Sequence, residues 1–223
     1  WTGDDREILR LAFPALGALI AEPLYILADT AVVGRIGTPQ LGGLALASSL
    51  LLIGHAVFIF LAYGTTSAVA RLLGAGEHRR AAHQAVQSLW LAALVGVALL
   101  GAGLAFGPAL IGALGGKGDV ATNAEVYLRI SMFGVPAMLI SLAGVGYLRG
   151  LQDTARPFYV ALATALLNLV LELILIYGFD LGIGASAFST VVAQWVAAGM
   201  FVWWIRKAVS AHEVTLGPDP AMI

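Results

Sequence analysis

Cysteine is absent from this sequence of 223 residues, and charged residues make up only 11% of it. The lack of cysteine excludes disulfides, thiolate catalysis and cysteine metal sites. The formal net charge of −1 favours neither a nucleic acid nor an acidic partner. An average globular domain is about 25% charged. The chain is therefore too poor in charge for an ordinary water-soluble domain.

Long apolar runs take the place of the missing charge. Apolar residues make up 60% of the sequence, and the mean hydropathy is +0.90. A helix needs about 20 apolar residues to cross ~30 Å of hydrocarbon, because it rises 1.5 Å per residue. The sequence contains six such runs, which predict an all-α integral membrane protein built as a bundle of six transmembrane helices. They lie near residues 8–33, 41–73, 86–114, 126–148, 158–177 and 183–205.

Basic residues near the ends of these runs predict the orientation of the bundle. The loops are short, so successive helices should be antiparallel, and Lys and Arg are retained on the cytoplasmic side of short loops. A cytoplasmic N-terminus places nine basic residues inside and only Arg35, Lys117 and Arg129 outside. We therefore expect a multi-pass protein of the cell inner (plasma) membrane. Because the sequence starts with Trp1 rather than Met, we also expect it to be a portion of a longer protein.

Three carboxylic acids, Glu22, Asp29 and Glu172, lie within the apolar runs. Each costs about 2.5 to 3.5 kcal/mol at the centre of a membrane helix, so such groups usually face a cavity or the bundle interior. Glu22 and Asp29 are seven residues apart, which places them within roughly 20° of one helix face. Tyr25 lies on the same face. The first helix is therefore predicted to present an acid, a phenol and a second acid to something other than lipid.

The fifth run places Asn168 and Glu172 four residues apart, on one face of a helix. An amide beside an acid can hold a proton or help to coordinate a small cation. Two interpretations stay open for these acids. Asp29 and Glu172 could instead form a structural hydrogen bond between helices, and Glu22 could be a hydrated cavity wall without a role in transport.

Other residues within the runs have simpler explanations. Pro14, Pro23 and Pro136 each remove a backbone hydrogen bond and permit a kink. Pro14 and Pro23 could let the first helix bend during function, although a static kink is the alternative. His55 is a lone imidazole, interpreted as a satisfied core residue or as a partner of a ligand. No metal-ligand spacing, nucleotide loop or nucleophile with its base is present, so we expect no metal, no cofactor and no enzyme.

Several motifs in order along the chain resemble one family. They are "FPAL", "LADTAVVGRIG", "LGGLALA", "GTTSAVARLLGAGE", "YLRGLQDTARP" and "NLVLELILIYGFDLGIGASAFSTVVAQW". The sequence is similar to the multidrug and toxic compound extrusion (MATE) transporters, and within them to the DinF-like branch. The resemblance implies two six-helix lobes that work by alternating access. Residues 1–210 would then be the N-terminal lobe, and residues 211–223 a cytoplasmic linker toward a C-terminal lobe.

The resemblance also implies roles for individual residues. Asp29 matches the coupling acid of the first helix, and Pro14 matches the proline at which that helix can bend. Asn168 and Thr190 match polar members of the same cluster, whereas Glu172 stands where the family commonly has Asp. The acid is thus kept but longer by one methylene group.

Two further residues are assigned to the substrate cavity. Glu22 stands where many relatives have an uncharged polar residue, so it adds a negative charge that would favour cations or add a titrating site. Tyr25 could contact an aromatic or cationic ligand, the latter by a cation–π attraction of about 0.5 to 2 kcal/mol.

The expected function is a secondary antiporter that exports drug-like or cationic organic compounds in exchange for H⁺ or Na⁺. Its partners would be a small organic substrate, the lipid bilayer, and a C-terminal lobe of the same protein or a second copy of this chain. A flippase for lipid-linked anionic saccharides is the first alternative, but it should need a basic cavity. A membrane scaffold without transport activity is the second, and it predicts that Asp29→Asn would leave efflux unchanged.

Overall fold

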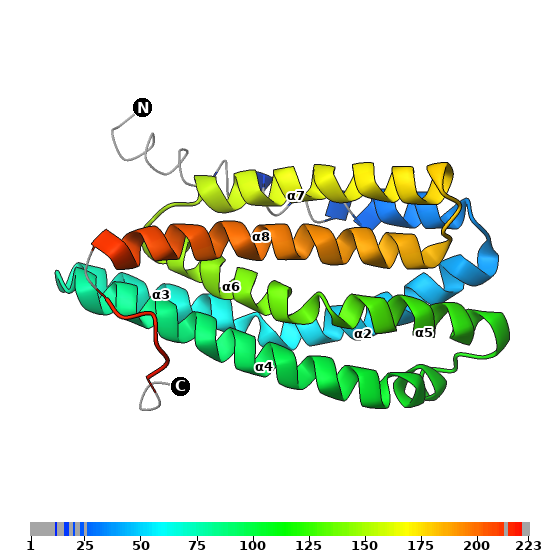
Figure 1. Cartoon of the computed structure of the whole chain (residues 1–223), viewed down its shortest axis with the longest axis horizontal. Helices are drawn as coiled ribbons and strands as arrows, with labels where there is room; N and C mark the ends of the chain where they lie inside the picture. The colour runs from blue at the N-terminus through cyan, green and yellow to red at the C-terminus, as the bar shows by residue number, and fades with distance from the viewer. Residues whose placement is uncertain are drawn as a thin grey trace.

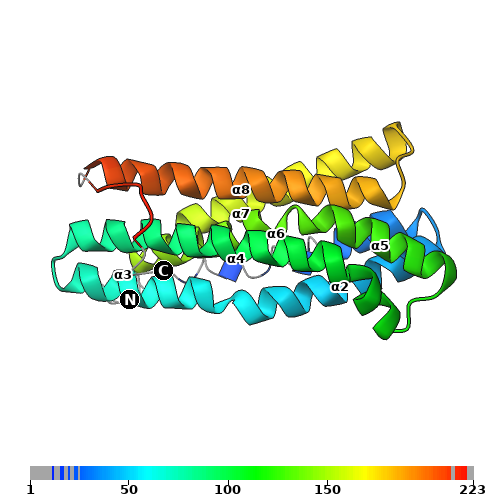
Figure 2. The same ribbon diagram turned by 60° about the horizontal axis from the view of Figure 1, so that its bottom comes forward.

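The computed structural model describes residues 12, 16–17, 20, 23–24, 26–211 and 214–219. These residues contain helices and no strand. Residues 26–34 are the described end of the first helix. The elements that follow are α2 (Thr38–Phe58), α3 (Phe60–Gly74), α4 (His78–Ala113), α5 (Gly118–Met132), α6 (Val135–Gly150), α7 (Ala155–Leu173), a π-helical segment η1 (Ile174–Gly178) and α8 (Ile183–Ala211). Figures 1 and 2 show them as an elongated bundle in which the helices follow the long axis.

The helices confirm the predicted all-α membrane architecture. Four described spans are long and apolar enough to cross a bilayer, with α2 and α3 together forming one of them, and the bent pair of α5 and α6 can form a fifth. The first predicted run, 8–33, is described only in part. Two helices begin well before their apolar runs, α4 at His78 and α5 at Gly118. An apolar run indicates only the part of a helix that lies in lipid. The helical backbone hydrogen bonds continue into the polar turns beyond that part, so the helix is longer than the run.

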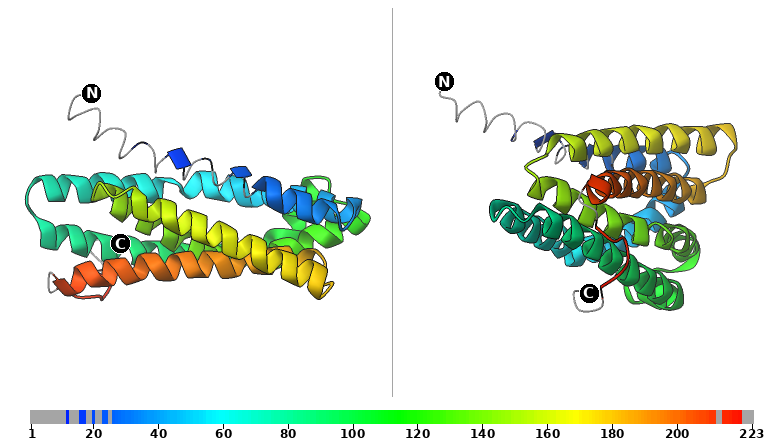
Figure 3. Two further views of the ribbon diagram at one scale, coloured as in Figure 1. Left: turned by 90° about the horizontal axis from the view of Figure 1, so that it is seen from above. Right: turned by 60° about the vertical axis from the view of Figure 1, so that its left-hand side comes forward.

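Two separate apolar cores hold the ends of the bundle together. At one end Leu44, Ile111 and Leu128 are buried in a shared core of α2, α4 and α5. At the other end Val86 of α4 and Ile205 of α8 are buried in a second core. Figure 3 shows α7 and α8 running alongside each other on one side of the bundle. Four of the nine buried polar side chains among the described residues lie on these two helices.

The fourth span is broken rather than continuous. The axes of α5 and α6 differ by 51°, and Pro136 lies in the first turn of α6. Proline has no N–H to continue the helical hydrogen bonding, which confirms the predicted kink. At the break, the indole N–H of Trp195 donates to the carbonyl of Phe133 over 3.0 Å. A side chain of α8 therefore satisfies a backbone group that lipid could not.

A glycine allows α2 and α5 to approach closely. A Cβ atom added at Gly43 would lie 2.7 Å from Cβ of Asn123 and 2.8 Å from the backbone nitrogen of Ala124. Real Cβ atoms do not tolerate such distances, so α5 would have to move. Gly54, farther along the same helix, has no such neighbour within 4 Å.

These two glycines give a matched pair of substitutions. We expect Gly43→Ala to destabilise the protein by about 1 to 3 kcal/mol, the usual cost of overpacking. Gly54→Ala should be neutral or stabilising by up to about 1 kcal/mol, because alanine favours a helix more than glycine does. The thermal unfolding midpoints of both variants in detergent check this. Equal midpoints would contradict the close packing of α2 against α5.

The chain turns back on itself after α8. Residues 214–219 cross the end of α4, as Figures 1 and 2 show. The side-chain amide of Gln87 donates to the carbonyl of Gly217 over 3.1 Å and accepts from the backbone N–H of Asp219 over 2.7 Å. The indole of Trp90 donates to the carbonyl of Leu216 over 2.9 Å. Side chains of α4 therefore hold the tail in place through hydrogen bonds to the backbone of the tail.

Candidate functional site

Buried and half-buried polar side chains gather where the first helix, α7 and α8 meet. We call this set the polar cluster; it consists of Asp29, Asn168, Glu172, Ser186, Ser189 and Thr190. The exposed fraction is 6% for Asp29, 1% for Asn168 and 0% for Glu172. Burying polar groups in an apolar bundle is costly unless they find partners. The arrangement of those partners therefore indicates what the site can do.

The two acids of the polar cluster lie close together. The hydroxyl of Ser186 donates to Oδ1 of Asp29 over 2.5 Å. The carboxyl group of Glu172 lies near enough to Asp29 and Ser186 to interact electrostatically with both. Two neighbouring carboxylates repel each other when both are ionised. A proton or a small cation between them would remove that repulsion.

The amide of Asn168 connects α7 to α8. Its Nδ2 donates to the hydroxyl of Thr190 over 3.0 Å and approaches the hydroxyl of Ser189 at 3.5 Å. Both hydroxyl groups in turn donate to the backbone carbonyl of Ser186, over 2.9 Å from Ser189 and 3.0 Å from Thr190. The α8 side of the polar cluster is thus held in a fixed geometry.

Three oxygen atoms of the polar cluster lack a hydrogen-bond partner among the described residues. They are Oδ1 of Asn168 and both carboxyl oxygens of Glu172. A buried acceptor without a donor costs about 1 to 3 kcal/mol. Oδ1 of Asn168 can only accept, and the oxygens of Glu172 accept when the acid is ionised, so a donor, a proton or a cation would supply the missing partner. Among the described residues, no group of three or more His, Asp or Glu side chains could hold a metal ion.

Local backbone structure explains how α7 and α8 meet at this point. The π-helical segment that begins at Ile174 follows Glu172 closely, and such wider turns are frequent at functional sites. After it, Asp180 at φ 54° and Gly182 at φ 63° adopt the left-handed conformation. These two residues reverse the chain within a short turn. Helix α8 therefore returns beside α7, with Ser186 and Thr190 near Glu172 and Asn168.

A cavity of about 360 Å³ adjoins the polar cluster, and Asp29 and Thr190 line it. We call it the Asp29 cavity. His55 of α2 also lines it and is half-buried, so this imidazole is not the core residue that its apolar surroundings suggested. Other polar side chains of the lining are Thr30, Ser48, Ser49, Tyr127 and Gln194. Neither Lys nor Arg is among the described residues that line this cavity.

The structure brings together four of the residues predicted from the sequence: Asp29, Asn168, Glu172 and Thr190. Pro14, Glu22 and Tyr25 lie outside the described residues. Pro23 is described and is exposed on the first helix.

Sequence reasoning missed Ser186 and Ser189. Their spacing with Thr190, at positions i, i+3 and i+4 of the segment "SAFST", places three hydroxyl groups on one helix face. That spacing was the signal available in the sequence.

Comparison with known proteins establishes the family. The sequence model of the family described as MatE matches residues 14–174. The chain belongs to the MatE family. This confirms the resemblance found in the sequence motifs and shows a multi-pass membrane protein.

Individual relatives agree with the family assignment. The MatE chain is 32% identical over 216 residues to Protein DETOXIFICATION 44, chloroplastic, of Arabidopsis thaliana, covering 91% of this chain and 41% of that protein. It is 29% identical over 217 residues to DNA damage-inducible protein F of Escherichia coli strain K12, covering 96% of this chain and 47% of that protein. The chain thus spans about half the length of the curated relatives it matches.

Solved structures also match this chain over only about half of their own length. The structure titled "Crystal structure of MATE in the bent conformation" superposes with a TM-score of 0.87 at 28% identity, covering 99% of this chain and 50% of that chain. The bundle of described helices therefore has the fold of one half of a MATE structure.

Proposed function

We propose that this chain is the N-terminal half of a secondary antiporter that exports drug-like or cationic organic compounds in exchange for H⁺ or Na⁺. The observation that carries the proposal is the double position of Asp29. Its carboxyl group belongs to the polar cluster, and it also lines the Asp29 cavity. An ion or proton that binds Asp29 can therefore affect a substrate in the cavity directly.

Exchange follows from competition for the same negative charge. A proton or cation taken up by Asp29 and Glu172 lowers the negative charge of the pair by one, which weakens the attraction of a cationic substrate to the cavity. Alternating access requires the loaded and unloaded forms to prefer different conformations. In the proposed cycle, ion loading supplies that difference by changing how the first helix packs against α7 and α8. In this scheme Asp29 and Glu172 couple the ion, while Asn168 and Thr190 hold the geometry.

The predicted roles of the first helix extend this scheme. Pro14 and Pro23 would let the helix bend as Asp29 changes its charge. Glu22 and Tyr25 would face the substrate. The names of relatives support an export function, among them Multidrug resistance protein MdtK of Klebsiella pneumoniae and Probable multidrug resistance protein NorM of Thermotoga maritima. The proposed orientation keeps the N-terminus in the cytoplasm and the protein in the inner membrane.

The charge of the Asp29 cavity argues against the flippase alternative. A phosphate-bearing saccharide needs Arg or Lys in its cavity. The described lining supplies the carboxylate of Asp29 and no basic side chain except the imidazole of His55. A positively charged or neutral substrate therefore suits this half of the cavity better.

Efflux from proteoliposomes that contain the complete protein tests the proposal. We expect an imposed pH or Na⁺ gradient to drive the export of a fluorescent organic cation without ATP. One of the two gradients should be sufficient, and the one that drives efflux identifies the coupling ion. The antiporter would be ruled out by efflux that requires ATP, or by an efflux rate that neither gradient changes.

A further inference from the structure

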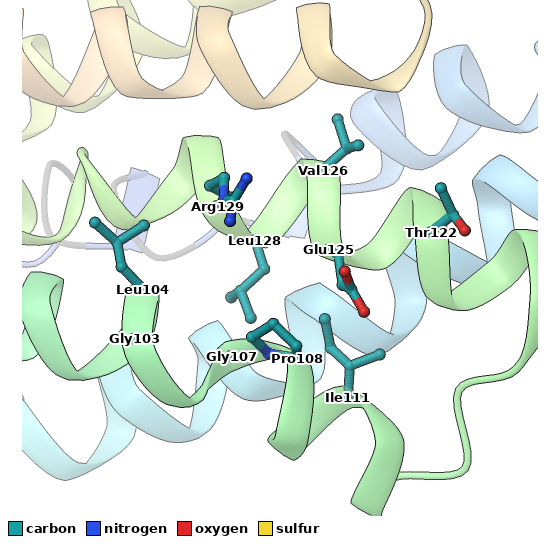
Figure 4. Close-up of a pocket in the computed structure, with 10 residues that line it drawn as sticks. All are labelled: Gly103, Leu104, Gly107, Pro108, Ile111, Thr122, Glu125, Val126, Leu128 and Arg129. Atoms are coloured by element: carbon teal, nitrogen blue, oxygen red, sulfur yellow. The ribbon is translucent and has the colours of Figure 1, made fainter.

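A second cleft lies between α4 and α5, on a different face from the Asp29 cavity. Its volume is about 140 Å³, several times the roughly 30 Å³ that one water molecule occupies in the liquid. Figure 4 shows Pro108 and Ile111 of α4 facing Glu125 and Leu128 of α5 across this space. We call it the α4–α5 cleft.

The α4–α5 cleft contains one acid and one base that do not pair. Glu125 and Arg129 are four residues apart, the spacing at which opposite charges on a helix usually interact. Both are exposed. The ion pairs among the described residues are Arg80 with Glu77 and Arg156 with Asp153. The carboxylate and the guanidinium thus line the same cleft and remain available to a ligand.

Helix α4 has a backbone carbonyl without its usual donor beside the same cleft. Pro108 lies within α4 and has no N–H, so the carbonyl of Leu104 loses its usual helical donor. Leu104 and Pro108 both line the cleft. In a bilayer such a freed carbonyl needs another partner, because no water is present in the hydrocarbon to supply one.

The α4–α5 cleft faces away from the Asp29 cavity and toward an apolar surface. Tyr127, which lines the Asp29 cavity, is two residues from both Glu125 and Arg129, and two residues correspond to about 200° around a helix. Next to the cleft, Phe106, Leu110 and Val126 are exposed. Exposed apolar side chains around a charged cleft suit a lipid better than a solute from water.

The depth of the charges also suits a lipid headgroup. Glu125 lies directly before the fourth predicted apolar run, 126–148, and Arg129 lies about 6 Å farther along the helix, in the first turn of that run. Charges at the edge of an apolar run lie next to the headgroup layer, which is about 5 to 8 Å thick on each side of a bilayer. The long side chain of Arg129 can extend toward that layer.

We propose that the α4–α5 cleft binds the headgroup of one phosphatidylethanolamine molecule. Arg129 binds the phosphate, since guanidinium groups match phosphate oxygens. Glu125 and the freed carbonyl of Leu104 accept hydrogen bonds from the primary ammonium group. Phosphatidylcholine has a trimethylated ammonium without an N–H donor, so it cannot make these bonds. Phosphatidylglycerol has no cation for Glu125.

Native mass spectrometry of the complete protein with defined lipids tests this site. We expect phosphatidylethanolamine to bind about 3- to 10-fold more tightly than phosphatidylcholine. Glu125→Gln should remove this preference, and Arg129→Gln should weaken the binding of both lipids. Asp119→Asn removes an exposed charge from the first turn of α5, outside the lining of the cleft, and should keep the preference.

Three results would overturn the proposal. One is equal binding of the two lipids to the unchanged protein, which is also the result expected if another part of the protein covers the cleft. Another is a preference that survives in Glu125→Gln. The third concerns soluble phosphoethanolamine, which should compete weakly; competition as strong as that of the lipid would assign the cleft to a soluble solute. Because binding is measured without transport, each of these failures leaves the antiporter proposal untouched.

Discussion

Asp29→Asn is expected to reduce gradient-driven efflux by about 100-fold or more, the scale of losing an essential proton-transfer group. Asparagine keeps the size of the side chain and can still accept the hydrogen bond from Ser186. It cannot take up a proton, and it offers a cation no negative charge. The protein should therefore fold, because the contacts of the polar cluster persist, while the link between ion and substrate is lost.

Asp180→Asn is the matched control for this change. Asp180 is exposed in the turn between α7 and α8 at φ 54°, a conformation that asparagine tolerates well. We expect its efflux to equal that of the unchanged protein. Efflux should be measured in proteoliposomes alongside the thermal unfolding midpoint, so that a loss of folding is seen separately. Normal gradient-driven efflux by a folded Asp29→Asn protein would support the scaffold alternative or another coupling acid.

Glu172→Gln tests whether Glu172 takes part in ion coupling or Asp29 acts alone. The amide of glutamine has the shape of a protonated Glu172 and can donate to Asp29 permanently. If the acids share one ion, this variant should bind substrate but fail to respond to a pH gradient. Efflux that follows the gradient normally in Glu172→Gln would assign coupling to Asp29 alone.

The sequence was sufficient to predict the polar residues of α7 and of the first helix. Each is a polar side chain within an apolar run, where its burial costs free energy. Asp29, Asn168 and Glu172 could be identified from cost and spacing alone. Ser186 and Ser189 could not be identified in this way, since a hydroxyl group costs little in a helix and resembles many other serines. Their importance depends on the turn at Asp180 and Gly182, which decides what α8 faces.

The α4–α5 cleft and the tail were missed for a different reason. Pro108 lies within the predicted run 86–114 but was not identified as a break in its hydrogen bonding. The carbonyl of Leu104 that it frees matters only because α5 packs opposite. Glu125 and Arg129 resemble an ordinary surface ion pair in the sequence. Only the structure shows that they do not pair. Long-range packing, rather than any local pattern, creates both features.

Gln87→Leu is expected to release residues 214–219 from α4. The side chain of Gln87 is only 1% exposed, and its amide makes two hydrogen bonds to the tail backbone. At about 1 kcal/mol for each bond, their loss should raise the population of the detached tail roughly 30-fold, since 1.4 kcal/mol corresponds to a factor of ten. Hydrogen exchange at the amide of Asp219 and the rate of proteolysis within the tail measure this population.

Two further substitutions on α4 show whether the amide itself is responsible. Trp90→Phe removes only the bond to Leu216, so we expect a smaller effect of about 5-fold for ~1 kcal/mol. Gln84→Leu makes the same chemical change as Gln87→Leu at a half-buried position of α4, where the side chain has no hydrogen bond to the tail, and should have no effect. Equal exchange in all three variants would mean that apolar contacts, such as that of Val214 with the core of α8, hold the tail instead. In the proposed complete transporter this tail leads toward the second lobe, so its attachment to α4 fixes where the connection between the two lobes begins.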